Sequence, residues 1–341
     1  MNYRVKRQAG LTLVELMIAT TLSLVLLAGV LLVFSANKTT YRMQNGLGTL
    51  QENGRYALGR ITADLQMAGF GGCLSPSVGP RIVVLANSGP SYLDDLANGE
   101  FFGGVNDDSG STSYGGKAMS AGTDSLEIRG ALSSGVNFVN AEVAAAGTIG
   151  LKSSVSSSAT VPYFMISDCS GADIFTATNS LASGSTTISH GTGSPGNTQA
   201  TLSRAFAKDA VVAELAAHTY FIGDTTRTNL AGDAILALYR FDGSTFQELV
   251  DGVEDLQIEY ALDTDNDDKI DAFADPGGVT NWADVMAVRV SLLINSVEAA
   301  SSVNAPYTFF PAGSNPIDPP TTDFRLRQEF TTLVSVRNSV L

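Results

Sequence analysis

The chain has 341 residues, of which 34 are acidic and 20 are basic, so its formal net charge is −14. A body this acidic repels nucleic-acid phosphates and anionic lipid head groups, so we expect no nucleic acid as the main partner. The length suits one large domain or two ordinary ones. The two cysteines, Cys73 and Cys169, are either buried thiols or one disulfide, and the compartment decides between them.

An apolar run from Leu11 to Ala36 carries a single charged side chain, Glu15. As a helix, the run rises about 39 Å at roughly 1.5 Å per residue, which exceeds the ~30 Å hydrocarbon core of a bilayer. The basic residues Arg4, Lys6 and Arg7 precede it and predict a cytoplasmic N-terminus with the body across the membrane. No A-x-A-like cleavage site follows the run, so we expect the helix to stay attached.

Residues 9–16 read AGLTLVEL at the start of this run. They resemble the type IV prepilin signature, in which a short basic leader ends in Gly and a hydrophobic residue, Thr, two aliphatic residues and Glu follow. Leu11 stands where Phe is commoner. The resemblance implies cleavage between Gly10 and Leu11 by a prepilin peptidase, and N-methylation of the new Leu11 amine. Loss of the three basic leader residues would move the formal charge from −14 to −17.

The carboxylate of Glu15 is unexpected in lipid, where an unpaired charge costs several kcal/mol. In pilin-like proteins a Glu at this spacing is thought to meet the free N-terminal amine of a neighbouring subunit. The resemblance therefore implies that Glu15 is the charge that guides assembly of a helix bundle. The alternative is a plain signal anchor with Glu15 near the head groups.

Helical spacing of apolar residues continues after Asn37 and predicts an amphipathic extension over residues 37–70 that packs on a sheet. Arg60 and Asp64 fall on the other, polar faces of this helix. Glycines weaken it by about 1 kcal/mol each relative to Ala, at Gly46, Gly48, Gly54 and Gly59. A second glycine cluster ends it, at Gly69, Gly71 and Gly72.

Short strand candidates follow, separated by loops rich in Ser, Gly, Thr and Ala. In the middle of the chain they are residues 81–86, 124–130, 161–168 and 172–178. The C-terminal third is more regular, with alternating segments at residues 211–223, 234–241, 255–262, 285–295 and 325–338. A tight DGST turn occupies residues 242–245. These segments predict an antiparallel sheet with one face in water.

The C-terminal segments HTYFIG, LALYRF, LVDGVEDLQIEYALDTDNDDKID and VSVRN resemble the PilW family of minor type IV pilins, relatives of the J-type minor pseudopilins of type II secretion. The resemblance implies an α+β pilin-like fold, with a long N-terminal helix packed on an antiparallel sheet that carries large loop decorations. The expected organisation is a cleaved leader (1–10), a transmembrane helix (11–36), its amphipathic extension (37–70) and an extracytoplasmic β-rich domain (71–341). Residues 74–205 carry no motif that matches.

Outside the cytoplasm, Cys73 and Cys169 are expected to form one disulfide, with free buried thiols as the alternative. The bond would tie the end of the helix to the strand at residues 161–168. Its loop of about 97 residues would contribute at most about 4–5 kcal/mol.

The acidic loop DTDNDDKID, residues 263–271, invites a calcium interpretation. Calcium takes six to eight oxygen ligands, and the candidates are Asp263, Asp265, Asp267, the Lys269 carbonyl and Asp271. Asp268 replaces the usual Gly at position 6, and Ala274 replaces the usual Glu at position 12. The alternative is a solvated acidic turn.

An enzyme is not expected. His190 and His218, the two histidines of the chain, read as structural or surface residues. With the cysteines paired, too few nitrogen and sulfur ligands remain for zinc. The stretch GSTSYGGKA at residues 110–118 has the wrong spacing for a phosphate loop, and no G-x-S-x-G motif occurs.

The leading hypothesis is a minor pilin that helps to initiate type IV pilus assembly from the bacterial inner membrane and sits at or near the fibre tip. Expected partners are other minor pilins and the major pilin, the prepilin peptidase, the inner-membrane assembly platform and a tip adhesin. Calcium is the one cofactor considered. One alternative is a minor pseudopilin of a type II secretion system, and another is a membrane-tethered binding module or adhesin.

Overall fold

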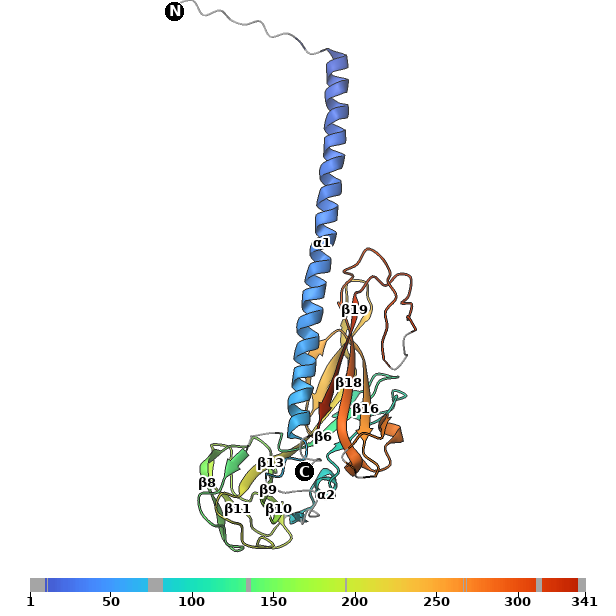
Figure 1. The fold of residues 1–341 in the computed structure, drawn as a ribbon. Coiled ribbons are helices and arrows are strands. Elements are labelled where there is room, and N and C mark those ends of the chain that lie inside the picture. Colours follow the sequence, from blue (N-terminus) through green and yellow to red (C-terminus); the bar gives the residue numbers. More distant parts are fainter. Residues whose placement is uncertain are drawn as a thin grey trace, which may run out of the picture.

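A computed structural model of the chain describes residues 10, 12–72, 82–132, 136–193, 195–265, 267, 269–310 and 315–336. A helix of 55 residues, α1 (Leu13–Met67), leads into a β-rich body. Figure 1 shows the N-terminal half of α1 projecting far from the body, which gathers around its C-terminal half. This arrangement confirms the expected α+β fold, in which a long helix packs against largely antiparallel sheets.

Among the described residues, the larger sheet has nine strands. Six follow the path β1-β10-β9-β13-β14-β15, while β3, β6 and β7 pair beside it. Strand β13 joins the two halves of this sheet, because its first part pairs with β7 and β9 and its second part with β6 and β14. The bounds are Ile82–Val84 (β1), Phe102–Gly103 (β3), Leu126–Gly130 (β6), Val136–Phe138 (β7), Tyr163–Asp168 (β9), Gly171–Thr176 (β10), Val211–Thr228 (β13), Ala234–Phe241 (β14) and Phe246–Asp251 (β15).

A second sheet, also described within these residues, has four strands in the order β17-β16-β18-β19. Its bounds are Val253–Leu262 (β16), Ala272–Ala274 (β17), Val285–Asn295 (β18) and Arg327–Ser335 (β19). The single sheet expected for the C-terminal third is therefore wrong, since β13 and β14 belong to one sheet and β16, β18 and β19 to the other. Gly252 turns the chain between β15 and β16 with a φ of +76°, a conformation that favours glycine.

Smaller elements decorate the body. In the described part of the chain, three further sheets have two strands each, the short pairs β4–β5 and β2–β12 and the longer pair β8–β11. The bounds are Ala86–Asn87 (β2), Ser113–Tyr114 (β4), Lys117–Ala118 (β5), Thr148–Val155 (β8), Ser185–Ser189 (β11), Gly196–Asn197 (β12), Tyr92–Ala97 (α2), Pro276–Gly278 (η2) and Trp282–Asp284 (η3). Strands β8 and β11 fall in stretches expected as loops or irregular β decorations, because their Ser, Gly and Thr residues show little apolar alternation.

The main core lies between α1 and the inner faces of both sheets. From α1 it takes Leu50, Ala57 and Ile61, none of which is exposed. Two of the four glycines expected to weaken the helix let it approach the body closely. A Cβ on Gly54 would lie 2.5 Å from the ring of Phe330 in β19, and one on Gly46 would lie 2.8 Å from the Ala300 side chain. These two glycines therefore serve packing rather than merely weakening the helix.

Candidate membrane anchor and assembly surfaces

The N-terminus of α1 is closed by a capping box between Thr12 and Glu15. The Glu15 carboxylate accepts a hydrogen bond from the Thr12 backbone N–H at 2.9 Å, and the Glu15 N–H donates to the Thr12 hydroxyl at 3.3 Å. The spacing T-x-x-E before an apolar run signals this motif in sequence, and our sequence reasoning missed it. Within one chain, Glu15 is thus already hydrogen-bonded at the helix start. Gly10 is exposed, and Leu11 lies outside the described residues.

The first half of α1 exposes its apolar side chains on all sides, as at Leu26 (71 % exposed) and Leu32 (73 %). Among the described helices, it is long and apolar enough to cross a membrane. Its hydroxyls are satisfied within the helix: Thr20 donates to the Met17 carbonyl at 3.0 Å, and Ser23 donates to the Ala19 carbonyl at 2.8 Å. Such internal pairing suits a hydrocarbon environment, where water cannot satisfy polar groups.

A buried polar cluster joins the second half of α1 to the larger sheet. The Asp64 carboxylate lies 2.7 Å from Nδ1 of His218 and accepts a 2.6 Å hydrogen bond from the Tyr220 hydroxyl, both on β13. The expectation that Asp64 lies on a polar face of the helix is wrong, because the residue is 5 % exposed. Burial by itself would raise the pKa of Asp64, but hydrogen bonds from His218 and Tyr220 outweigh it and lower that pKa.

Both histidines have structural positions. His218 belongs to the cluster with Asp64, and His190 packs edge-on against the Phe175 ring. Burial lowers the pKa of His190. We expected structural or surface residues, and neither histidine is a surface residue, since each is at most 6 % exposed.

The described residues include one of the two cysteines. Cys169 lies in the turn between β9 and β10, and Cys73 lies outside the described residues. The chain just before Cys73 is fixed close to β9, because the Ser167 hydroxyl donates a 2.8 Å hydrogen bond to the Gly71 carbonyl. Along the sequence, Cys73 follows Gly71 by two residues, and Cys169 follows Ser167 by two. The disulfide between the two cysteines stays a prediction.

Three of the five predicted calcium ligands come together in the loop after β16. One carboxylate oxygen from each of Asp263, Asp265 and Asp267 lies within 4.8 Å of the others. The Asp267 N–H also donates to the Asp263 carboxylate at 3.1 Å, which holds the turn closed. Neighbouring carboxylates raise the pKa of Asp265, with Asp267 contributing the most, then Asp271, and Asp263 less.

Asp271, another predicted ligand, is hydrogen-bonded within the loop, whereas the predicted role of the Lys269 carbonyl stays a prediction. The Asp271 carboxylate accepts hydrogen bonds of 2.7 Å from the backbone N–H and from the hydroxyl of Thr264. These bonds lower the pKa of Asp271. The Lys269 ammonium pairs with Asp267, so it competes with a cation for that carboxylate. The three aspartates offer a cation fewer oxygens than calcium needs, and backbone carbonyls or water would have to supply the rest.

A charged network that the sequence did not reveal fixes the start of β19. The Arg327 guanidinium binds both oxygens of Glu254 at 2.7 and 2.8 Å, and it also pairs with Asp323. Arg325 binds Asp323 as well, at 2.8 Å. The side chains of Arg327 and Asp323 are 6 % and 7 % exposed. Burial would raise the pKa of Asp323, but hydrogen bonds from Arg325 and Arg327 lower it.

Comparison with known families assigns both ends of the chain. The family described as Type IV Pilus-assembly protein W matches residues 219–338, and the prokaryotic N-terminal methylation motif matches residues 5–31. The first match runs from the second half of β13 to the end of β19 and includes the acidic loop, and the second covers the end of the leader and the start of α1. Comparisons with curated proteins and with solved structures gave no match. The exposed N-terminal helix, the sheet-covered helix half and these two matches together support a PilW-like minor pilin associated with type IV pili.

Proposed function

We propose that the protein primes assembly of type IV pili from the bacterial inner membrane and occupies a position at or near the fibre tip. The observation that carries the proposal is the long apolar half of α1, exposed on all sides and opening with the Glu15 carboxylate. An apolar helix of this length needs lipid or other helices around it. In the membrane it has lipid, and in a fibre it has the helices of neighbouring subunits.

Glu15 is the charge proposed to recognise a neighbouring subunit when the helix passes from lipid into the fibre. After cleavage between Gly10 and Leu11, the new amine would stand one residue before Thr12, whose N–H already holds the Glu15 carboxylate. A carboxylate near a bilayer interior gains most from a positive partner. The methylated Leu11 amine of an adjacent subunit is that partner, and its pairing with Glu15 sets the axial offset between the two helices.

A chromosomal deletion tests the role in assembly. We would count sheared surface pili and assay secreted enzymes in the same cultures, with complements carrying wild type, Glu15→Ala or Glu52→Ala. Glu52 is a matched control, because it is exposed on the same helix but lies outside the apolar half. Loss of pili with normal secretion, rescued by wild type and Glu52→Ala but not by Glu15→Ala, is the expected result. Lost secretion with normal pili would instead assign the protein to type II secretion.

If pili and secretion both stay normal, a membrane-tethered binding module or adhesin becomes the better interpretation. Mass spectrometry of the purified chain tests processing separately. The mature protein should begin at Leu11 with one methyl group on its amine, and a chain that retains residues 1–10 would contradict the prepilin assignment. The body then lies on the periplasmic side until the subunit enters the fibre.

Calcium binding at Asp263, Asp265 and Asp267 is a further part of the proposal. A cation there would relieve the mutual repulsion that raises the pKa of Asp265. Calcium at 100 times its Kd would stabilise the fold by about 2.7 kcal/mol. Asp265→Asn should remove this calcium-dependent rise in melting temperature, and Asp94→Asn, an exposed aspartate on α2, should keep it. An equal melting temperature in calcium and in chelator for wild type would refute the site.

A further inference from the structure

Within the described residues, strand β19 has an unpaired outer edge, and the role of α1 as a membrane anchor does not explain it. Strand β19 is the last strand of the four-stranded sheet, and its nine residues pair with β18 without a register shift. The Val336 N–H donates to the Met286 carbonyl, and the Leu326 carbonyl accepts from the Ser296 N–H. Hydrogen-bonded pairs recur at every second residue of an antiparallel ladder. Even-numbered residues of β19 therefore bond to β18, and odd-numbered residues turn their N–H and C=O groups outward.

Among the described residues, these outward groups meet no backbone partner at Thr331, Leu333 and Ser335. All three residues are exposed. The segment Thr331–Ser335 reads TTLVS, with no charge and no proline, and it spans roughly 14 Å as a strand. Long, uncharged and unbroken edges are templates for pairing with another strand.

The other outermost strands of the two sheets lack this character. Strands β1 and β17 have three residues each. Strand β15 carries a register shift in its ladder with β14, and the Asn53 side chain on α1 donates to its Asp251 carbonyl. Proteins protect edges by such short strands, bulges and covering groups. Within the described residues, β19 is the long outermost edge that is left without them.

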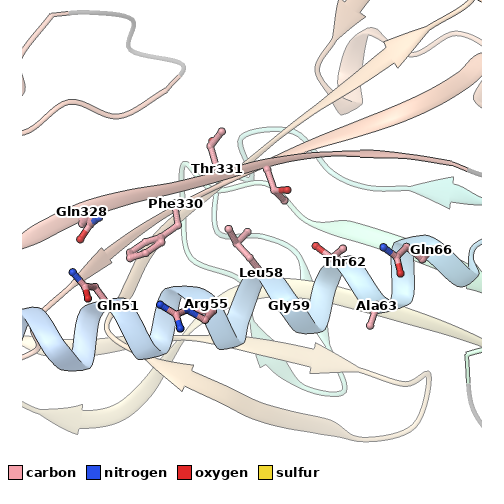
Figure 2. Close-up of a pocket in the computed structure, with 11 residues that line it drawn as sticks. Gln51, Arg55, Leu58, Gly59, Thr62, Ala63, Gln66, Gln328, Phe330 and Thr331 are labelled. Carbon is pink, nitrogen blue, oxygen red and sulfur yellow. The ribbon is translucent and has the colours of Figure 1, made fainter.

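A groove of about 750 Å³ runs beside this edge, between β19 and α1. Figure 2 shows Gln51, Arg55 and Gln66 along the helix side and Gln328 and Thr331 on the strand side. The α1 side of the groove is open at Gly59, because a Cβ there would meet nothing within 4 Å. A strand added to the sheet would lie about 4.8 Å from β19 and border this groove.

The direction of β19 decides against a second copy paired through the same edge. Leu326 lies against Gly46, and Phe330 lies against Gly54, so β19 and α1 run in the same direction. Antiparallel pairing of two β19 edges would make the two α1 helices point in opposite directions. Both apolar halves could then not enter one membrane or one helix bundle. This rules out antiparallel pairing with a second copy through the same edge and favours a segment of a different chain as the occupant.

We propose that the β19 edge and this groove bind an extended segment of another pilin subunit, which joins the four-stranded sheet as a fifth strand. The partner's identity as a pilin rests on the proposed function, whereas the strand pairing rests on the edge itself. Backbone hydrogen bonds from Thr331, Leu333 and Ser335 would supply the affinity. The polar side chains that line the groove would contact the edge of the added segment that faces away from β19.

Photo-cross-linking from β19 in living cells tests the pairing. A benzophenone amino acid replaces Leu333 or Ser335 in the full chain, and the cross-linked residues of the partner are identified by mass spectrometry. Side chains two apart in β19 should reach residues two apart in one segment of another pilin subunit, because neighbouring strands keep register. The same probe at Gln247 on β15 is the control edge and should give no such ladder. Absent cross-links, scattered ones, or cross-links to a second copy of this chain would overturn the proposal.

Two variants separate backbone pairing from side-chain contact, with the probe kept at Ser335. Leu333→Pro removes one outward N–H and spares the bonds to β18, whereas Leu333→Ala shortens the side chain and keeps the N–H. We expect at least a fivefold loss of cross-linking for Leu333→Pro and less than a twofold loss for Leu333→Ala. Equal yields in both variants would contradict strand addition.

Another variant blocks the groove without changing β19, in case Leu333→Pro does not fold. Gly59→Phe fills the groove from the helix side and should also lower the yield at least fivefold, while Gly48→Phe, in equally open space outside the groove, should not. Melting of the full chain in detergent verifies folding of each variant. If cross-links to another subunit form but Glu15→Ala still assembles pili, strand addition stands and the proposed role of Glu15 fails.

Discussion

Two glycines five residues apart on α1 should respond to alanine with opposite signs. Gly54 is buried, and a Cβ there would lie 2.5–2.6 Å from three atoms of the Phe330 ring. Gly59 is exposed, and a Cβ there would meet nothing within 4 Å. Alanine in a helix interior stabilises by about 1 kcal/mol relative to glycine at either position. At Gly54, overpacking against the ring opposes this gain by about 1–3 kcal/mol.

The two terms give a loss of about 0–2 kcal/mol for Gly54→Ala and a gain of about 1 kcal/mol for Gly59→Ala. The measurement is thermal and urea unfolding of the full chain in detergent, where 1 kcal/mol corresponds to about 2–4 °C in a domain of this order. The double variant Gly54→Ala/Phe330→Leu should recover part of the loss, because the smaller side chain frees the space. The reasoning is refuted if Gly54→Ala stabilises the protein as much as Gly59→Ala does.

Three further substitutions test the contacts that hold the body together. Asp64→Asn should lower stability by about 1–3 kcal/mol at neutral pH, because it weakens buried hydrogen bonds to a charged acceptor. The folded pKa of Asp64 lies below its unfolded value of 3.8, so the contribution is full above that pH and fades as pH falls through the folded pKa. Urea titrations at several pH values should show the two proteins converging in acid, and a constant difference would count against the ionised cluster. Arg327→Ala should cost about 3–5 kcal/mol by removing the buried guanidinium that pairs with both Glu254 and Asp323, and an unchanged unfolding midpoint would contradict this. Cys169→Ser should cost at most about 4–5 kcal/mol if Cys73 is bonded to it, and a wild-type protein that keeps its stability in reductant would show that the bond is absent.

Local periodicity was enough to predict the long helix and several of the strands. The apolar run and the amphipathic spacing predict one continuous helix, and α1 extends without a break from Leu13 to Met67. The alternating segments at 234–241 and 285–295 coincide with β14 and β18. Local patterns suffice here, because the spacing of apolar residues reports the period of the element and the face that is buried.

Sequence patterns failed where apolar alternation is weak. Strands β8 and β11 are rich in Ser, Gly and Thr, and their few apolar side chains pack in a separate core. The N-terminal leader and Glu15 were recognisable because that motif is contiguous. The capping partner Thr12 was equally readable from the T-x-x-E spacing, and we overlooked it.

Which surfaces meet depends on contacts between distant parts of the chain, and no local pattern reports these contacts. A polar residue at a helical position reads as exposed, yet Asp64 is buried because His218 and Tyr220 of β13, more than 150 residues away, arrive at the same point. The strands of the C-terminal third separate into two sheets at Gly252, and that division leaves β19 as an open edge beside α1. Periodicity predicts which face of an element is buried but not which other element packs against it. Whether a charged side chain is buried, or a strand edge is exposed, depends on that second element.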